Sequence, residues 1–235
     1  MNKKFLELNS ENPTSSERLD VKAISMKTTL LFILVSTFII TGCSGKSVSD
    51  VTTTDPGVVI NGITWATRNV DAPGTFAETN ESAGMFYQWN SNIGWSSSNP
   101  IKNTNGDYSW IMIGGGRITE WTKENDPCPE GWRLPTKEEI KELLDTGKVI
   151  KEWGTLHGVK GMLFTDKASG NNIFLPAAGH RSDNGSLYLA GIRGDYMSRS
   201  ITSYYAHYLH FDEINSGCGD GNISGQGNSI RCVHK

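Results

Sequence analysis

The sequence predicts an α+β domain built mostly from short antiparallel strands and long loops, with one clear helix. Three observations carry this prediction. Turn residues such as Asn61 and Gly62 separate short β-branched runs, which is typical of β-hairpins. A capped amphipathic pattern marks the helix near 137–146. Segments rich in glycine, asparagine and serine, at 89–105 and 217–227, connect the elements as loops.

Several short strands are predicted along the chain. The first hairpin joins Val58–Ile60 to Ile63–Trp65 through Asn61 and Gly62, which tolerate the positive φ angles of a type I′ turn. A second hairpin is predicted to join Asn172–Leu175 to Leu187–Ala190 through the turn Asp183-Asn184-Gly185. Two later strand patterns lie at Tyr204–Phe211 and at Ser229–His234. Alternation should place one set of side chains on a single face: Tyr205, His207, Leu209 and Phe211.

The helix is predicted to span Lys137–Thr146. Thr136 precedes it as the N-cap, and Glu139 three residues later completes a capping box. Gly147 follows as the expected C′ residue. The face that should pack on a sheet consists of Ile140, Leu143 and Leu144.

The composition fits one folded domain that does not bind nucleic acid. The chain has 235 residues, of which 37% are hydrophobic and 20% charged, so there is room for one core. Its 22 basic and 25 acidic residues give a formal net charge of −3, which provides no basic field to hold a phosphate backbone. The 9% aromatic content argues against disorder along the whole chain.

The first 42 residues are predicted to be a signal region. A basic start at Met26 is followed by the largely apolar stretch Leu30–Ile40 and by the small residues Thr41 and Gly42. The apolar stretch is too short for a permanent membrane helix, which needs about 20 apolar residues. Residues 1–25 are either a long n-region or precede a true start at Met26.

The run Ile40-Thr41-Gly42-Cys43 resembles the lipobox of bacterial lipoproteins. This resemblance implies cleavage before Cys43, whose thiol then carries a diacylglycerol thioether. We therefore expect residues 43–57 to form a polar tether and residues 58–235 to form the folded domain. The expected location is the cell envelope, on the outer membrane or the cell surface. The membrane is then a partner through the lipid anchor.

Three cysteines remain after Cys43, namely Cys128, Cys218 and Cys232. An exported protein can keep disulfides, so one pairing is expected. Three thiols allow three single pairings, and the residues alone leave all three open. A bridge between Cys128 and Cys232 would tie the segment before the helix to the last strand.

Five blocks of the sequence together resemble the FISUMP ("major paralogous domain") family of bacterial secreted and surface proteins. In order, these blocks are Gly62–Val70, Ala83–Trp89, Cys128–Thr136, Leu175–Arg181 and Ser229–Val233. The resemblance implies a C-type-lectin-like α+β fold and a disulfide between Cys128 and Cys232. The resemblance also implies a fold related in shape to that of the formylglycine-generating enzymes. The segment Tyr196–Ser200 departs from the family pattern, and Cys218 has no counterpart in it.

The sequence offers little support for a metal site. The calcium motifs of sugar-binding C-type lectins are missing, so a lectin-like fold does not imply their calcium site. Asp220, Asn222 and Ser224 match the first half of an EF-hand-like loop, but Arg231 stands where that loop needs a bidentate carboxylate. The histidines and cysteines lack the spacing of a zinc site. We expect neither a metal nor another cofactor.

The tryptophans fall into two groups. Those in or near regular elements are expected in the core, and they are Trp65, Trp132 and Trp153. Those that flank polar loops are candidates, as exposed rings, for stacking on a glycan or contacting a protein partner, and they are Trp89, Trp95 and Trp110. The alternative is that these three rings only hold the long loops in place.

These patterns favour a noncatalytic binding or adhesion module at the cell surface, with glycan recognition as one form of it. The alternative is a structural or accessory subunit of a surface assembly, such as a pilus or a nutrient-uptake complex. A third hypothesis is an enzyme related to the formylglycine-generating proteins, which would need Cys218 and Cys232 to hold copper. The chain lacks a Gly-x-Ser-x-Gly elbow and a phosphate-binding loop, so we expect no enzyme.

Overall fold

The computed structural model describes residues 54–113, 120–202, 205–221 and 225–235. All of them belong to one compact unit, Lys46–Lys235. The predicted signal region, Cys43 and the tether as far as residue 53 lie outside the described residues. So do Asn222 and Ser224 of the half-matched calcium loop.

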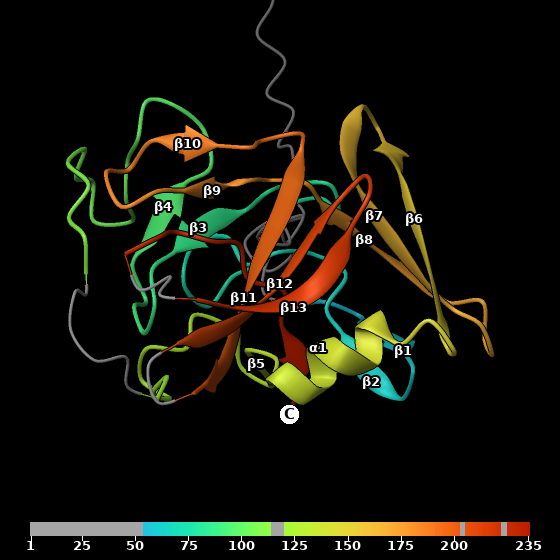
Figure 1. The fold of residues 1–235 in the computed structure, drawn as a ribbon. Helices are drawn as coiled ribbons and strands as arrows, with labels where there is room; N and C mark the ends of the chain where they lie inside the picture. Colours follow the sequence, from blue (N-terminus) through green and yellow to red (C-terminus); the bar gives the residue numbers. More distant parts are fainter. Residues whose placement is uncertain (1–53, 114–119, 203–204, 222–224) are drawn as a thin grey trace, which may run out of the picture. The chain divides into compact units, whose positions relative to one another are not determined.

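The predicted α+β class is confirmed, because the described residues form small antiparallel sheets and one helix (Figure 1). The first sheet has the order β1-β2-β14-β5, with strands Val58–Ile60, Ile63–Trp65, Val233–His234 and Trp132–Arg133. Two three-stranded sheets follow, formed by β6 (Val149–Leu156), β7 (Val159–Asp166) and β8 (Asn172–Pro176), and by β11 (Arg193–Ile201), β12 (Ala206–Asp212) and β13 (Ser216–Gly221). The remaining two pairs are β3 (Met85–Tyr87) with β4 (Gly94–Ser96), and β9 (His180–Arg181) with β10 (Leu187–Tyr188).

The first predicted hairpin is confirmed, and the last predicted strand is shorter than expected. Asn61 and Gly62 have φ angles of 47° and 79°, as a type I′ turn requires. Regular pairing of the last strand covers only Val233–His234 instead of Ser229–His234. The residues before it make only isolated backbone contacts, such as the bond from Ala66 N to Cys232 O at 2.9 Å and the bridge between Ser229 and Tyr196 of β11.

The second predicted hairpin is wrong, because its first strand pairs with a different partner. Asp183-Asn184-Gly185 does turn the chain toward Leu187, but it connects β9 to β10. The strand β8 instead pairs with β7, in the register Met162 opposite Leu175. The error arose because a turn signal fixes where the chain reverses, whereas pairing depends on long-range packing.

The helix α1 spans Lys137–Leu144 and begins as predicted. The Thr136 hydroxyl accepts from Glu139 N at 3.2 Å, and a Glu139 carboxylate oxygen accepts from Thr136 N at 2.7 Å, which completes the capping box. The end is two residues earlier than predicted, and Asp145 is the C-cap in place of a Gly147 C′ residue. The reason is local, since the Asp145 carboxylate accepts from Gly147 N at 2.8 Å and holds a turn.

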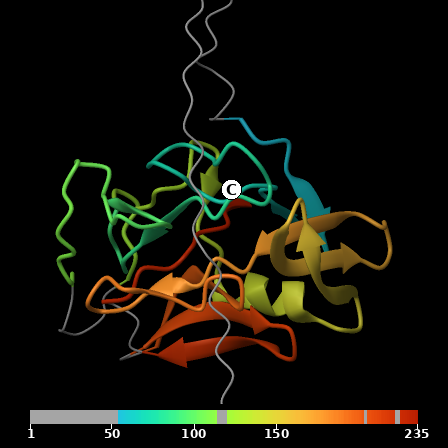
Figure 2. The same cartoon turned by 90° about the horizontal axis from the view of Figure 1, so that it is seen from above.

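The core consists of two groups of buried side chains. The first lies among α1, the four-stranded sheet and the two three-stranded sheets, and α1 contributes Ile140 and Leu143 to it. The second surrounds the disulfide between Cys128 and Cys232, whose Cα atoms are 6.1 Å apart. This pairing confirms the one implied by the family resemblance. In both views α1 lies beside the β11–β13 sheet (Figures 1 and 2).

Strand β12 confirms most of the predicted face. His207, Leu209 and Phe211 are buried, whereas Tyr205 precedes the strand and is exposed. Of the tryptophans expected in the core, Trp65 and Trp132 are buried. Trp153 is half-buried on the edge strand β6, where its ring meets Phe211 edge-on.

Candidate functional site

The three tryptophans predicted to offer exposed rings lie mostly inside the domain. Trp89 and Trp95 are buried, so the expectation of exposed rings is wrong for them. Trp89 contacts Trp121 with ring centroids 5.0 Å apart, and Trp95 contacts the half-buried Trp110 at 4.9 Å. The Trp110 ring lies against Gly185 and Gly227, where any Cβ would collide with it. In these contacts the rings hold loops in place, which was the alternative interpretation.

A buried arginine fixes the same loops. Arg181 is fully buried, and its guanidinium donates to the carbonyl oxygens of Ser96, Ser98 and Gly185 at 2.8, 2.6 and 2.7 Å. Burial lowers the pKa of this guanidinium below its ordinary value. Arg181 therefore satisfies the backbone of an irregular segment, and it has a structural role.

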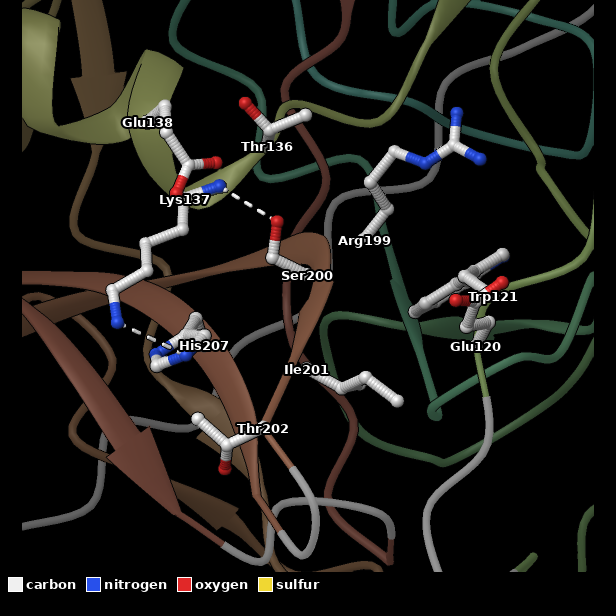
Figure 3. A pocket seen from close by; sticks show the side chains of 10 residues that line it. All are labelled: Glu120, Trp121, Thr136, Lys137, Glu138, Arg199, Ser200, Ile201, Thr202 and His207. Carbon is white, nitrogen blue, oxygen red and sulfur yellow. Dashed lines mark hydrogen bonds between the residues drawn. The ribbon is translucent and has the colours of Figure 1, made fainter.

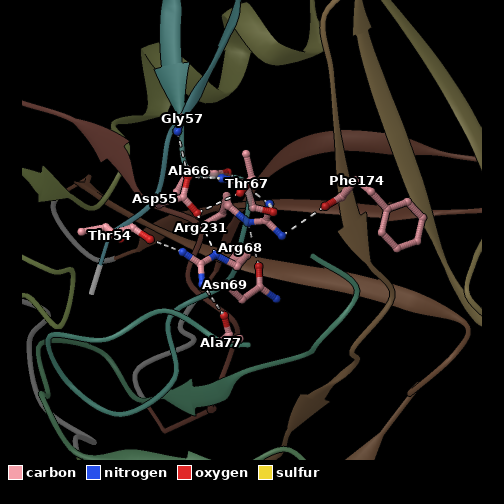
Figure 4. Close-up of polar contacts among 10 residues, drawn as sticks. All are labelled: Thr54, Asp55, Gly57, Ala66, Thr67, Arg68, Asn69, Ala77, Phe174 and Arg231. Atoms are coloured by element: carbon pink, nitrogen blue, oxygen red, sulfur yellow. Dashed lines mark hydrogen bonds and ion pairs between the residues drawn. The ribbon is translucent and has the colours of Figure 1, made fainter. Parts of the chain in front are cut away.

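A second buried arginine lies in a polar network that joins the start of the domain to its end (Figure 4). Arg231 donates to Asn69 Oδ1 at 2.8 Å and to the carbonyls of Thr67 and Phe174 at 2.6 and 3.1 Å. Nearby, Asp55 accepts from Arg68 Nε at 3.2 Å. Burial lowers the pKa of Arg231 to about 10.

An open polar cavity lies where helix α1 begins, and we name it the helix-entrance pocket (Figure 3). Its volume is about 470 Å³, within the range of small-molecule sites. Four segments meet in it: the first turn of α1, the end of β11, strand β12 and the chain at 120–121. The lining residues are Glu120, Trp121, Thr136, Lys137, Glu138, Arg199, Ser200, Ile201, Thr202 and His207.

Hydrogen bonds hold one wall of the helix-entrance pocket in place. Lys137 Nζ lies 3.1 Å from Nε2 of the buried His207, and Lys137 N donates to Ser200 Oγ at 2.9 Å. Behind this wall, Ser198 Oγ donates to the His207 carbonyl at 2.7 Å. The side chains of Lys137 and His207 are therefore positioned before any ligand arrives.

An irregularity in β11 gives the pocket its second wall. The pairing register of β11 with β12 shifts between Met197 and Ile201, and Arg199 and Ser200 lie in that interval. Such irregularities re-aim side chains out of the regular pleat. Arg199 is exposed and lines the cavity, and its backbone N donates to Pro135 O at 2.8 Å.

The pocket presents charges of both signs together with hydroxyl groups. Lys137 and Arg199 are cationic, whereas Glu120 and Glu138 are acidic. The hydroxyls come from Thr136, Ser200 and Thr202. Within the described part of the chain, no histidine is hydrogen-bonded to Ser200 Oγ, so a hydrolase-type nucleophile and base are not paired there. The arrangement is suited to binding a polar ligand.

The side chains of residues 54–113, 120–202, 205–221 and 225–235 give little support for a metal site or a reactive thiol pair. No group of three or more His, Cys, Asp and Glu side chains within these ranges is placed to hold a metal ion. Cys218 is a half-buried free thiol on β13, and burial raises its pKa. Cys232 forms the disulfide with Cys128, so the copper pair with Cys218 is not present in this structure.

The sequence interpretation missed the residues of the helix-entrance pocket. One signal did point toward it, because Tyr196–Ser200 was the segment that departs from the family pattern, and it contributes Arg199 and Ser200. His207 was predicted only to share one strand face with Tyr205, Leu209 and Phe211. Its contact with Lys137, which is 70 residues away in the sequence, carries no local signal.

None of the described helices is long and apolar enough to span a membrane. Comparison of the chain with protein-family models, with curated proteins and with solved structures finds no match.

Proposed function

We propose that this chain is a lipid-anchored protein of the cell envelope whose C-type-lectin-like domain is a noncatalytic binding module. The helix-entrance pocket is its ligand site, and the ligand is a glycan that carries an acidic group. The single observation that supports this most is the position of Lys137 and Arg199 around an open cavity that hydroxyl groups also line.

The chemistry of the pocket supports an acidic, hydroxylated ligand. The Arg199 guanidinium offers a planar fork of donors that matches a carboxylate. The positive end of the α1 dipole lies at the same cavity, because Thr136 and Lys137 begin the helix. Glu120, Glu138 and the hydroxyl groups can accept hydrogen bonds from sugar hydroxyls.

The test is a glycan array of neutral and acidic glycans, followed by calorimetry on the bound ones. Arg199→Gln should weaken binding of an acidic glycan about tenfold, which corresponds to about 1.4 kcal/mol. Lys141→Gln is the matched control, since Lys141 is an exposed cation on the same helix that does not line the cavity. Equal affinity in Arg199→Gln and the unchanged protein would contradict the assignment of the site.

The lipid anchor is tested separately. Mass spectrometry of the mature protein should show an acylated Cys43 as the first residue, and Cys43→Ser should release the protein from membranes. An unmodified Cys43 in the membrane fraction would remove the anchor from the proposal without affecting the pocket.

An accessory role in a surface assembly is the second candidate, and one observation favours it. Tyr108, Ile111 and Met112 are 61%, 69% and 47% exposed on one loop, which is unusual for apolar side chains so close together. A photo-crosslinking residue at position 111 should then form one defined adduct in intact cells. The control is the same residue at the exposed Val59, and equal labelling at both positions would argue against an assembly contact.

A further inference from the structure

The outer face of the β6–β8 sheet carries a second hollow, which we name the sheet groove. Its volume is about 430 Å³. It crosses all three strands, and Val58, Thr67 and Asn80 from other segments also line it. The sheet groove shares no lining residue with the helix-entrance pocket.

The strand register explains why this face is hollow. Glu152, Leu163 and Phe174 stand opposite one another across the three strands and form one row of side chains. The next row contains the pair Gly154 and Gly161, which have no side chains. The Phe174 ring covers Gly161, since a Cβ there would approach the ring to 2.6 Å. A Cβ on Gly154 would meet nothing within 4 Å, so the space above Gly154 is open.

Polar side chains surround this apolar floor. Asn80, Glu152 and Asn172 line the sheet groove, and all three are exposed. Their side chains make no hydrogen bond to other described residues of the chain, so their donors and acceptors are available to a ligand. The adjacent Glu81 pairs with His157 Nδ1 at 3.1 Å and ties the Asn80 loop to the turn between β6 and β7.

The charge of the lining restricts the class of ligand. Among the described residues that line the sheet groove, Glu152 is the only charged one. No lysine or arginine there could neutralise a carboxylate or a phosphate, and burial of an unpaired anion is costly. The sheet groove therefore disfavours an anionic ligand, in contrast to the helix-entrance pocket.

We propose that the sheet groove binds an uncharged sugar residue. A hexopyranose has an apolar C–H face, which suits the half-buried Leu163 side chain on the floor of the sheet groove. Its hydroxyls can donate to the Glu152 carboxylate and exchange hydrogen bonds with the amides of Asn80 and Asn172. This site is independent of the acidic-glycan site, so either proposal can fail without the other.

Gly154→Val is the decisive variant. The backbone at Gly154 does not have a positive φ, the added side chain enters open space, and valine is favoured in strands. The variant should therefore fold, which its melting curve checks, while its side chain fills the sheet groove. The probes are hexasaccharides of glucose, galactose and mannose, with hexagalacturonate as the acidic counterpart, each titrated by calorimetry and by NMR.

At least one neutral hexasaccharide should bind. In Arg199→Gln, whose acidic-glycan site is weakened, hexagalacturonate should bind at least tenfold more weakly than that neutral hexasaccharide. Gly154→Val should weaken the neutral ligand at least tenfold, and Glu152→Gln about threefold to tenfold. Glu213→Gln is the control, because Glu213 is an exposed carboxylate outside the sheet groove. Arg199→Gln should leave neutral binding unchanged.

Three results would overturn the proposal. The first is that none of the neutral hexasaccharides binds. The second is neutral binding that survives in a folded Gly154→Val variant. The third is hexagalacturonate binding in Arg199→Gln that is as tight as that of the neutral ligand and is lost when Gly154→Val is added, since the sheet groove would then not discriminate by charge.

Discussion

Two fully buried arginines hold two parts of the domain, and the parts differ in what else supports them. Arg231 lies next to Cys232, in a region where a disulfide, a four-stranded sheet and the Asp55–Arg68 pair also act. Arg181 lies among the loops at 96–99 and 182–186, and the neighbouring elements β3, β4, β9 and β10 have only two or three residues each. We call these the clamped region and the loop region.

The comparison shows that a guanidinium can take the place of regular secondary structure. Each arginine donates mainly to backbone carbonyls that no strand or helix satisfies. Five donors in a rigid fork allow one side chain to serve several carbonyls at once. In the clamped region the hydrogen bonds of Arg231 add to a covalent link, whereas in the loop region those of Arg181 are a principal polar support. The two regions should therefore fail in different ways.

The largest effect is expected from removing the disulfide. The double substitution Cys128→Ser and Cys232→Ser opens a cross-link between residues 104 apart in the sequence. Closing a loop of that length contributes up to about 4.7 kcal/mol in the chain-entropy model, so the free energy of unfolding should fall by several kcal/mol. Urea denaturation measures it. Cys218→Ser is the control and should leave stability nearly unchanged, and an equal loss in both variants would show that the clamp contributes little.

Replacing the arginines should come next and should separate the two regions. Arg231→Met leaves the Ala66, Thr67 and Phe174 carbonyls without their donor, and it should cost about 3–5 kcal/mol of global stability. Arg181→Met should instead open the loop region locally, so that amide exchange at 96–99 and 182–186 rises more than the melting temperature falls. Hydrogen exchange read by mass spectrometry distinguishes the two. If Arg181→Met unfolds the whole domain as readily as Arg231→Met, the loop region is not a separate unit.

Acid should weaken the clamped region before the loop region. Hydrogen bonds from the backbone N–H groups of Ser169 and Asn61 lower the pKa of Asp166 below its ordinary value. Because the folded pKa is depressed, this contribution is present above the unfolded value of about 3.9 and is lost as pH falls through the folded pKa. Arg181 does not titrate in this range. The protection of the Asn61 amide, measured against its intrinsic exchange rate at each pH, should fall below about pH 4, and Asp166→Asn should abolish that fall.

The smallest effect is expected at a surface ion pair near the clamped region. Lys148 Nζ lies 3.4 Å from a Glu142 carboxylate oxygen, and both side chains are about half exposed. Lys148→Ala should therefore change the free energy of unfolding by about 0.5 kcal/mol or less. A loss above about 1 kcal/mol would mean that surface charge, and not the buried network, stabilises this side of the domain.

Local signals predicted the parts of the fold that depend on neighbouring residues. The Asn61-Gly62 turn and the capping box at Thr136 were predicted because their chemistry lies within four residues of sequence. The partner of β8 was predicted wrongly because pairing depends on distant strands. The exposure of Trp89 and Trp95 was also predicted wrongly, since a polar flanking sequence does not reveal what covers a ring in space.

Most residues of the two candidate sites could not be predicted from the sequence alone. The helix-entrance pocket joins segments near residues 120, 137, 200 and 207, and no local pattern brings them together. The sheet groove depends on Gly154 and Gly161 standing opposite each other, which requires the register of β6 and β7. The disulfide was implied by the family resemblance, whereas the residues alone left three pairings open.

The place of β14 has a consequence for biogenesis. Val233 is hydrogen-bonded between a strand that starts at residue 63 and one that starts at residue 132. That sheet cannot be completed until residue 233 has been synthesised. Cys128 cannot form its disulfide until Cys232, 104 positions later, has been synthesised. Until then the earlier strands have an open edge, which makes the newly made chain vulnerable to aggregation and proteases.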